Sequence, residues 1–155
     1  MKYILPGLAL ACAFALSLVI PAPASSAGEF GSRDDAVAMV KHIQDYYAQN
    51  GAEATLKAIT DKKFVDRDLY PFANSFDGVS AAHGANQAMV GKNMNDIKDP
   101  SGKFLVREIV RIAKEDGHGW VDYSWPNPVT KKIDNKSSYV ERMGDYAIGV
   151  GVYNP

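Results

Sequence analysis

Apolar residues recur along the first part of this 155-residue chain with the period of a helix. In the stretch SRDDAVAMVKHIQDYYAQNG, residues 32–51, they are spaced by four, three and four positions, at Ala36, Val40, Ile43 and Tyr47. This spacing predicts a helix with one apolar face. Ser32 followed by Asp35 resembles a capping box at its start, and Gly51 is placed to end it. A second, shorter helix is predicted over AEATLKAIT, residues 52–60.

The pattern then changes to that of strands. The stretches DLYPFANSF and VSAAH flank Asp77 and Gly78, a pair that favours the tight turn of a hairpin. Residues 84–102 are rich in Gly, Asn and Asp, which predicts a loop. This loop leads to a predicted helix over KFLVREIVRIAKEDG, residues 103–117.

Three further extended segments follow this helix: GWVDYSW, SSYVERM and YAIGVGVY. They are separated by PNPVTKKIDN and by a turn at Gly144 and Asp145. Helices placed before and within a run of hairpin-joined strands are typical of α+β proteins. The sequence therefore predicts a five-stranded antiparallel sheet with the long N-terminal helix packed on one face.

Residues 1–27 are predicted to be a secretory signal peptide. Lys2 is followed by an uncharged run, and PAPASSA offers small residues for cleavage after Ala24 or Ala27. A retained membrane anchor is the alternative, because the run is about long enough to span a bilayer, although a Pro-Gly pair interrupts it. Residues 28–155 then form a single domain, which we expect in the periplasm or outside the cell.

The composition of the predicted mature chain excludes several classes of function. The sole cysteine, Cys12, lies in the predicted signal peptide, so disulfides, thiol catalysis and cysteine-bound metal are excluded. Removing Lys2 with that peptide leaves no basic bias, which argues against nucleic acid as a partner. His42, His83 and His118 are too far apart to suggest a metal site, and no G-x-S-x-G motif is present. We therefore predict neither an enzyme nor a bound cofactor.

Five stretches, in this order, resemble a single Cache domain of type 2: DLYPFANSFDGVSAAH, GKNMNDIKDPSGKFLVREIV, GHGWVDYSWPNP, KSSYV and YAIGVGVY. The resemblance covers roughly residues 33–153. Such domains are extracytoplasmic sensors with a PAS-like sheet and a long leading helix, and they usually form the outer part of chemoreceptors and sensor kinases. The resemblance implies a small-molecule pocket on the sheet face opposite the long helix. It also implies a small carboxylate ligand, such as acetate, propionate or pyruvate.

The aromatic residues of GHGWVDYSWPNP are candidates for the lining of this pocket. On a regular strand, Tyr123 and Trp125 face one way and Trp120 faces the other. We expect Tyr123 and Trp125 to line the pocket, where their rings exclude water and their O–H and N–H groups donate to a ligand oxygen. Trp120 is expected in the core. The alternative is that all three are ordinary core aromatics.

The other candidate ligand-binding residues are implied by the resemblance. Lys136 is expected to contact the ligand carboxylate, because a buried anion needs a compensating charge, and a solvated loop lysine is the alternative. Tyr139 follows on the same predicted strand with the other parity, so one of these two side chains is expected to point away. His83 is expected either to donate to a ligand oxygen or to bond to the backbone of its turn. Tyr70 and Phe72 complete the set.

These features predict an extracytoplasmic domain that binds a small organic carboxylate and acts in signal transduction. The family's usual membrane segment and cytoplasmic module do not follow the last predicted strand in this sequence. The expected partner is therefore a separate membrane protein, a sensor kinase or chemoreceptor. A homodimer through the long helix is a further expectation of the resemblance, although the polar face of that helix offers no hydrophobic patch that requires it. The alternatives are a periplasmic enzyme or accessory factor that reuses the fold, and a receptor domain that has lost its ligand.

Overall fold

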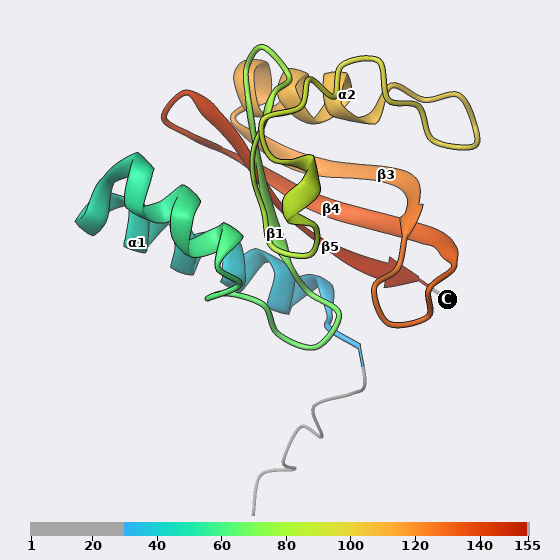
Figure 1. Cartoon of the computed structure of the whole chain (residues 1–155), viewed down its shortest axis with the longest axis horizontal. Helices are drawn as coiled ribbons and strands as arrows, with labels where there is room; N and C mark the ends of the chain where they lie inside the picture. The colour runs from blue at the N-terminus through green and yellow to red at the C-terminus, as the bar shows by residue number, and fades with distance from the viewer. Residues whose placement is uncertain (1–29, 155) are drawn as a thin grey trace, which may run out of the picture.

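The computed structural model describes residues 30–154, and the predicted signal peptide lies outside them. Within this range a long helix precedes the first strand, and short helices separate the second strand from the third (Figure 1). The elements are α1 (Arg33–Thr60), β1 (Pro71–Ser75), β2 (Ser80–His83), the 3-10 helix η1 (Gln87–Met89), α2 (Leu105–Arg111), the π-helix η2 (Ile112–Asp116), β3 (His118–Pro126), β4 (Ile133–Met143) and β5 (Tyr146–Asn154). None of the helices in this described range is long and apolar enough to cross a bilayer.

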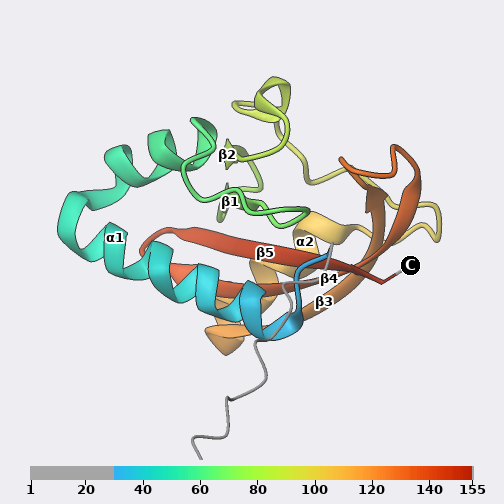
Figure 2. The ribbon, with the colours of Figure 1, turned by 90° about the horizontal axis from the view of Figure 1, so that it is seen from below.

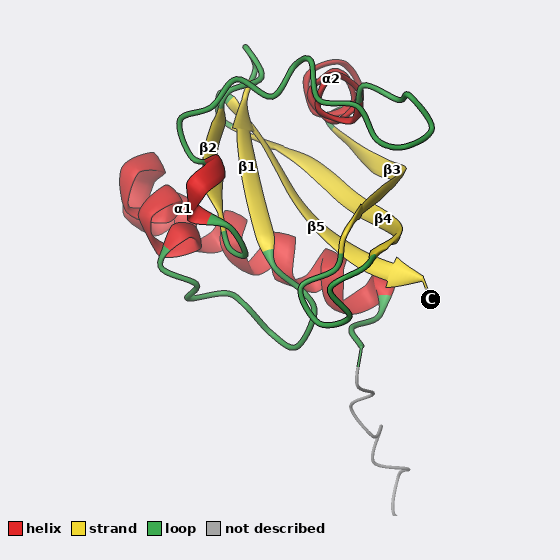
Figure 3. Ribbon diagram, turned by 45° about the vertical axis from the view of Figure 1, so that its right-hand side comes forward, coloured by secondary structure: helices red, strands yellow, loops and turns green. Residues whose placement is uncertain are grey.

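The strands form one antiparallel sheet in the order β2-β1-β5-β4-β3. The last strand in the sequence, β5, therefore lies at the centre of the sheet. Helix α1 covers one face of the sheet, and α2 lies on the other, as Figures 2 and 3 show. The predicted α+β, PAS-like architecture, with five strands and the long N-terminal helix on one face, is confirmed.

Helix α1 begins with the predicted capping box. The backbone N–H of Asp35 donates to the Ser32 Oγ over 3.1 Å, and the N–H of Ser32 donates to the Asp35 Oδ2 over 2.9 Å. These bonds satisfy two donors that a helix start otherwise leaves unpaired. Gly51 has a φ of 78°, a value that glycine adopts without steric cost. Its backbone is not helical, so it interrupts α1 where the sequence predicts a helix end, and the two predicted helices lie on either side of this kink.

Strand β4 begins earlier than the sequence predicts. Its pairing with β3 starts at Ile133 opposite Pro126, so only a short turn joins the two strands. Asn127 holds this turn, because its side-chain oxygen accepts two backbone N–H groups. Lys136, expected at the edge of a loop, consequently lies inside the strand and opposite Tyr123.

Each face of the sheet carries its own apolar core. Ile43 of α1 packs with Ile148 of β5 on one face, and Ile109 of α2 packs with Val140 of β4 on the other. The central strand is bulky toward α1 and small toward α2. The small residues on the α2 face are Ala147, Gly149 and Gly151. They leave space above the middle of the sheet on that face.

Candidate ligand-binding site

A cavity lies on the α2 face of the sheet, opposite α1. The space open to the centres of water molecules is about 30 Å³, which is room for roughly two or three waters or a small organic ligand. Six of the seven predicted site residues line it: Tyr70, Phe72, His83, Tyr123, Trp125 and Lys136. Apolar side chains of α2 and of the preceding loop contribute Met94, Leu105, Val106 and Ile109.

Two glycines of β5 let neighbouring side chains lie across the centre of the sheet. A Cβ atom on Gly149 would collide with the ring of Phe72, and one on Gly151 would collide with the Cε of Lys136. Because these positions carry no side chain, the Lys136 chain crosses β5 and brings its Nζ to 3.7 Å from the centroid of the Tyr70 ring. The cavity therefore depends on the small residues of the central strand.

The amine of Lys136 is almost completely buried, with the residue only 1% exposed. Besides facing the Tyr70 ring, its Nζ lies 3.4 Å from the hydroxyl of Tyr153. Cation–π contacts favour the charged form. Burial has the larger, opposite effect and lowers the pKa of Lys136 well below its usual value. A carboxylate in the cavity would supply the counter-charge that the amine lacks.

The hydroxyls of Tyr70 and Tyr153 form a directed hydrogen-bond chain. Tyr153 donates to the carbonyl of Pro126 over 2.8 Å. Because a phenol carries one proton, Tyr70 must be the donor in the 2.8 Å contact between the two hydroxyls. Burial raises the pKa of both tyrosines, so both stay protonated. Tyr153 thus accepts from both Tyr70 and Lys136.

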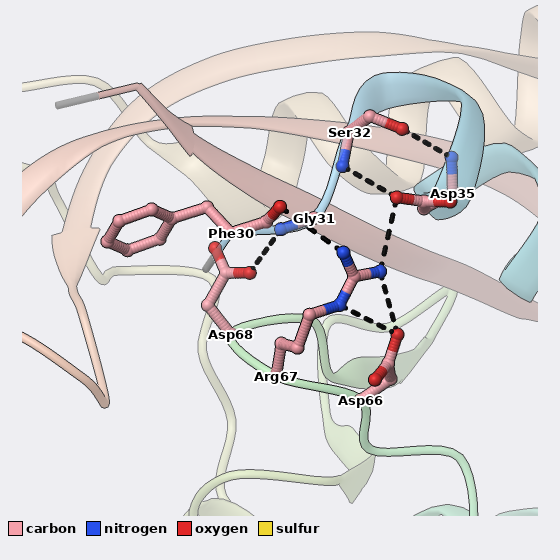
Figure 4. A network of polar contacts seen from close by, with 7 residues as sticks. All are labelled: Phe30, Gly31, Ser32, Asp35, Asp66, Arg67 and Asp68. Carbon is pink, nitrogen blue, oxygen red and sulfur yellow. Dashed lines mark hydrogen bonds and ion pairs between the residues drawn. The ribbon is translucent and has the colours of Figure 1, made fainter. Parts of the chain in front are cut away.

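Asp68 places a fully buried carboxylate near the same end of the cavity. Its Oδ1 accepts the backbone N–H of Gly31 over 2.6 Å, as Figure 4 shows. Its Oδ2 has no hydrogen-bond partner among the described residues. The charge of Asp68 raises the pKa of Lys136, although less than burial lowers it. Asp68 therefore interacts electrostatically with the amine of Lys136 and by a hydrogen bond with Gly31, in the segment that precedes α1.

Arg67 ties the same segment in place from the surface. Its guanidinium pairs with Asp35 at 3.2 Å and with Asp66 at 2.8 Å, and it donates to the carbonyl of Phe30 over 3.3 Å (Figure 4). The start of α1 is thus fastened to the residues that directly precede Tyr70.

His83 bonds to the backbone of its turn, which is one of the two roles that the sequence left open. Its Nδ1 accepts the backbone N–H groups of Ala85 at 3.2 Å and Asn86 at 3.1 Å. Burial, with a smaller contribution from the charge of Lys136, lowers the pKa of His83 to about 4. The imidazole is therefore neutral near pH 7, with its proton on Nε2. That N–H remains as a donor at the wall of the cavity.

The aromatic residues of β3 divide between the two faces as the strand alternation predicts. Tyr123 and Trp125 line the cavity, with their ring centroids 6.2 Å apart and the rings nearly perpendicular. The Tyr123 hydroxyl contacts the Ser138 Oγ at 2.8 Å. Trp120 packs instead on the α1 side, where the Arg33 guanidinium lies 3.7 Å from its ring centroid.

Tyr139 does not lie in the cavity, so its predicted placement there is wrong. Its side chain packs in the core beneath α1, with its ring centroid 5.5 Å from that of Trp120. The reason is strand parity: Tyr139 is three residues from Lys136 in a regular strand, so their side chains face opposite sides.

Several residues of the site were missed from the sequence. Tyr153 lies on the same face of its strand as Gly149 and Gly151 in YAIGVGVY. This alternation could have indicated from the sequence that Tyr153 lies near the cavity. Asn74 shares its parity with Tyr70 and Phe72, and it too lines the cavity. Within residues 30–154, no three His, Cys, Asp or Glu side chains are grouped to hold a metal ion.

A wider outer hollow of about 330 Å³ adjoins the cavity. Tyr70, His83, Met89 and Trp125 line both spaces. The outer hollow is also bordered by the turn between β3 and β4. His83 and Trp125 therefore lie at the boundary between the cavity and the outer hollow.

A five-stranded antiparallel sheet with the long helix on one face and a small cavity on the other is a PAS-like architecture. Residues 31–154 match the sequence profile of the Cache domain family. The chain belongs to that family, whose members are extracytoplasmic sensor domains.

Two characterised proteins contain a similar region. The sensor histidine kinase MctS of Rhizobium johnstonii is 30% identical over 118 residues, which cover 72% of this chain and 25% of the kinase. The methyl-accepting chemotaxis protein McpP of Pseudomonas putida is 31% identical over 90 residues, which cover 57% of this chain and 16% of that protein. The shared region spans a quarter or less of the length of these relatives.

Solved structures show the same fold. A Cache chemosensory domain studied for its carboxylic acid recognition is 28% identical, with a TM-score of 0.62, over 79% of this chain and 88% of that one. The periplasmic sensor domain of a chemotaxis protein is 26% identical, with a TM-score of 0.63, over 79% of this chain and 90% of that one.

Proposed function

We propose that this protein is a sensor domain that reversibly binds a small organic carboxylate of the size of acetate, propionate or pyruvate. The observation that carries the proposal is the buried amine of Lys136 at the wall of the cavity. It has no ion-pair partner within 4 Å among the described residues. Burying an unpaired amine costs stability, and an anionic ligand explains why the residue stands there.

The cavity offers a carboxylate two donors and an apolar enclosure. The Lys136 ammonium supplies charge and N–H groups, and the Nε2–H of His83 supplies a second donor from the neighbouring wall. The rings of Phe72, Tyr123 and Trp125 would cover the alkyl part of the ligand. The small size of the cavity favours ligands with few heavy atoms.

The domain would transmit binding as a shift between two states, since a ligand favours only the state that it binds better. Asp68 offers a physical route, because it senses the charge of Lys136 and holds the backbone of Gly31 at the entry to α1. We propose that a membrane-bound sensor kinase or chemoreceptor recognises the bound state. The resemblance to a sensor histidine kinase and to a methyl-accepting chemotaxis protein supports this partner class.

Thermal unfolding of the purified protein tests the proposal with small mono- and dicarboxylates, amino acids and amines. We expect the melting temperature to rise with one carboxylate class, because a ligand that binds only the folded state stabilises it. Lys136→Met, which keeps an unbranched side chain of nearly the same length without its charge, should abolish the rise. Lys132→Met, at an exposed lysine of the neighbouring turn, is the matched control and should leave the rise unchanged. A protein that melts cooperatively and responds to no carboxylate would contradict the proposal.

A further inference from the structure

The cavity has a second polar end that the contact with Lys136 does not use. Asn74 of β1 and Ser80 of β2 line it and are only 5% and 3% exposed. Among residues 30–154, no group hydrogen-bonds to the Asn74 amide or to the Ser80 hydroxyl. Only Asp68 Oδ2 is completely enclosed without a partner in this range. The polar atoms of Asn74 and Ser80 therefore keep some accessible surface. We take this surface to face the cavity, because both residues line it.

A β-bulge turns Ser80 toward the cavity. Ala73 pairs with Ala82, and Asn74 pairs with Ser80, so Ala81 has no partner on β1. With regular alternation Ser80 would face the same side as Ala82, which packs in the core beneath α1. The extra residue instead brings Ser80 to the face of Asn74. Bulges often re-aim a side chain beside a binding site in this way.

The charges around the cavity favour an uncharged group at this end. Apart from Lys136 and His83, no acidic or basic side chain lines the cavity in the described range. A second carboxylate would therefore lack a cation, a ligand ammonium would lack an anion, and burying either unpaired is costly. An amide and a hydroxyl can both donate and accept, which suits a hydroxyl or carbonyl oxygen.

The spacing places this oxygen away from the carboxylate. Asn74 follows Tyr70 by four residues in an extended segment, so it lies two same-face positions further along the chain than Tyr70. The amine of Lys136 lies over the Tyr70 ring, and Phe72 lies between the two ends. If Lys136 binds the carboxylate, an oxygen on the second carbon of the acid would lie beside Lys136 and would not reach Asn74 and Ser80. We infer that the ligand is a short-chain carboxylic acid with a hydroxyl or carbonyl oxygen near its fourth carbon, bound by Asn74 and Ser80.

This inference rests on the proposed function, because Lys136 would hold the carboxylate. Calorimetric titration of the purified protein with butyrate, 4-hydroxybutyrate and 2-hydroxybutyrate tests it. We expect 4-hydroxybutyrate to bind at least about fivefold more tightly than butyrate, as one recovered hydrogen bond allows. We expect 2-hydroxybutyrate to show no such gain.

Two variants remove the polar groups separately. Asn74→Leu and Ser80→Ala should each bring the ratio between 4-hydroxybutyrate and butyrate close to one while butyrate binding persists. Ser124→Ala, at a serine that does not line the cavity, is the control and should keep the ratio. Ser80→Ala removes a single oxygen and stands in for Asn74→Leu if that variant does not fold. Equal binding of the two acids by the unmodified protein, or an unchanged ratio in Ser80→Ala, would overturn the inference alone. Failure of every carboxylate to bind would overturn the proposed function as well.

Discussion

Single residues of the candidate site lower the stability of the folded protein. In the unfolded chain the Lys136 amine has its ordinary pKa, whereas burial lowers that pKa in the folded protein. Below the ordinary value the unfolded state therefore binds more protons, and the contribution of Lys136 to folding worsens as the pH falls toward neutrality. A residue that lowers stability in this way is typical of sites where function limits stability.

His83 makes the folded protein sensitive to acid. Its pKa falls from 6.5 to about 4 on folding, so the unfolded chain takes up a proton first as the pH is lowered. The stability present above pH 6.5 should be lost progressively toward pH 4, by about 3 kcal/mol from this group. His83→Asn keeps an oxygen for the backbone N–H groups but does not titrate. Denaturant unfolding at pH 7 and pH 4 should show a smaller loss for His83→Asn than for the unmodified protein, and equal losses would contradict the assignment.

The sequence predicts the orientation of single residues wherever strand alternation is regular. Parity correctly separates Tyr123 and Trp125 from Trp120, and it also separates Lys136 from Tyr139. It fails for Ser80, because the bulge at the unpaired residue reverses the alternation and leaves no local mark in the sequence.

At the scale of whole elements, the central strand decides whether the cavity exists. β5 faces the cavity with glycines, and its neighbours extend side chains across the space that results. The sequence shows the glycines of YAIGVGVY, but it does not show that β5 becomes the central strand. That position follows from the long-range pairing of β5 with β1 and β4.

Gly151→Ala should damage binding through the position of Lys136. The new Cβ would collide with the Cε of Lys136 and the Oγ of Ser138, so the lysine chain must leave its path across β5. We expect a loss of about 1–3 kcal/mol in unfolding free energy and a loss of carboxylate binding. Gly119→Ala on β3 is the control, because its Cβ meets only the Ile112 side chain, at 3.0 Å. Thermal unfolding with and without ligand measures both effects, and unchanged binding in Gly151→Ala would show that Lys136 need not cross the strand.

For the whole molecule, the sheet separates a core beneath α1 from the cavity on its other face. Fold class and helix placement could be predicted, because hydrophobic periodicity over long segments specifies them. The break between the two N-terminal helices could be predicted as well, because glycine adopts the positive φ found at Gly51 without strain. The polar end of the cavity was beyond prediction, since it depends on contacts between distant segments.

Ligand binding should slow hydrogen exchange on one side of the sheet only. Residues 84–104 supply Met89 and Met94 to the cavity, and the structure contains no strand in this segment. Their amides should exchange more slowly in the bound protein, because closing on a ligand suppresses local opening. Amides of residues 36–43 in α1, which lie on the opposite face, serve as the internal reference. Exchange followed by mass spectrometry measures both segments, and protection confined to the reference segment would place the ligand on the wrong face.

The burial of Lys136 has a consequence for the quantity that such a domain would report. A carboxylate that enters the cavity restores the charged amine, so wherever the ambient pH lies between the empty and filled pKa values of Lys136, each ligand arrives together with one proton. Occupancy then depends on the product of anion and proton concentrations, which is proportional to the concentration of the undissociated acid. Within that range a tenfold rise in acidity and a tenfold rise in the anion are equivalent. The protein would thus respond to the concentration of the undissociated organic acid, and the concentration of its salt alone would not determine the response.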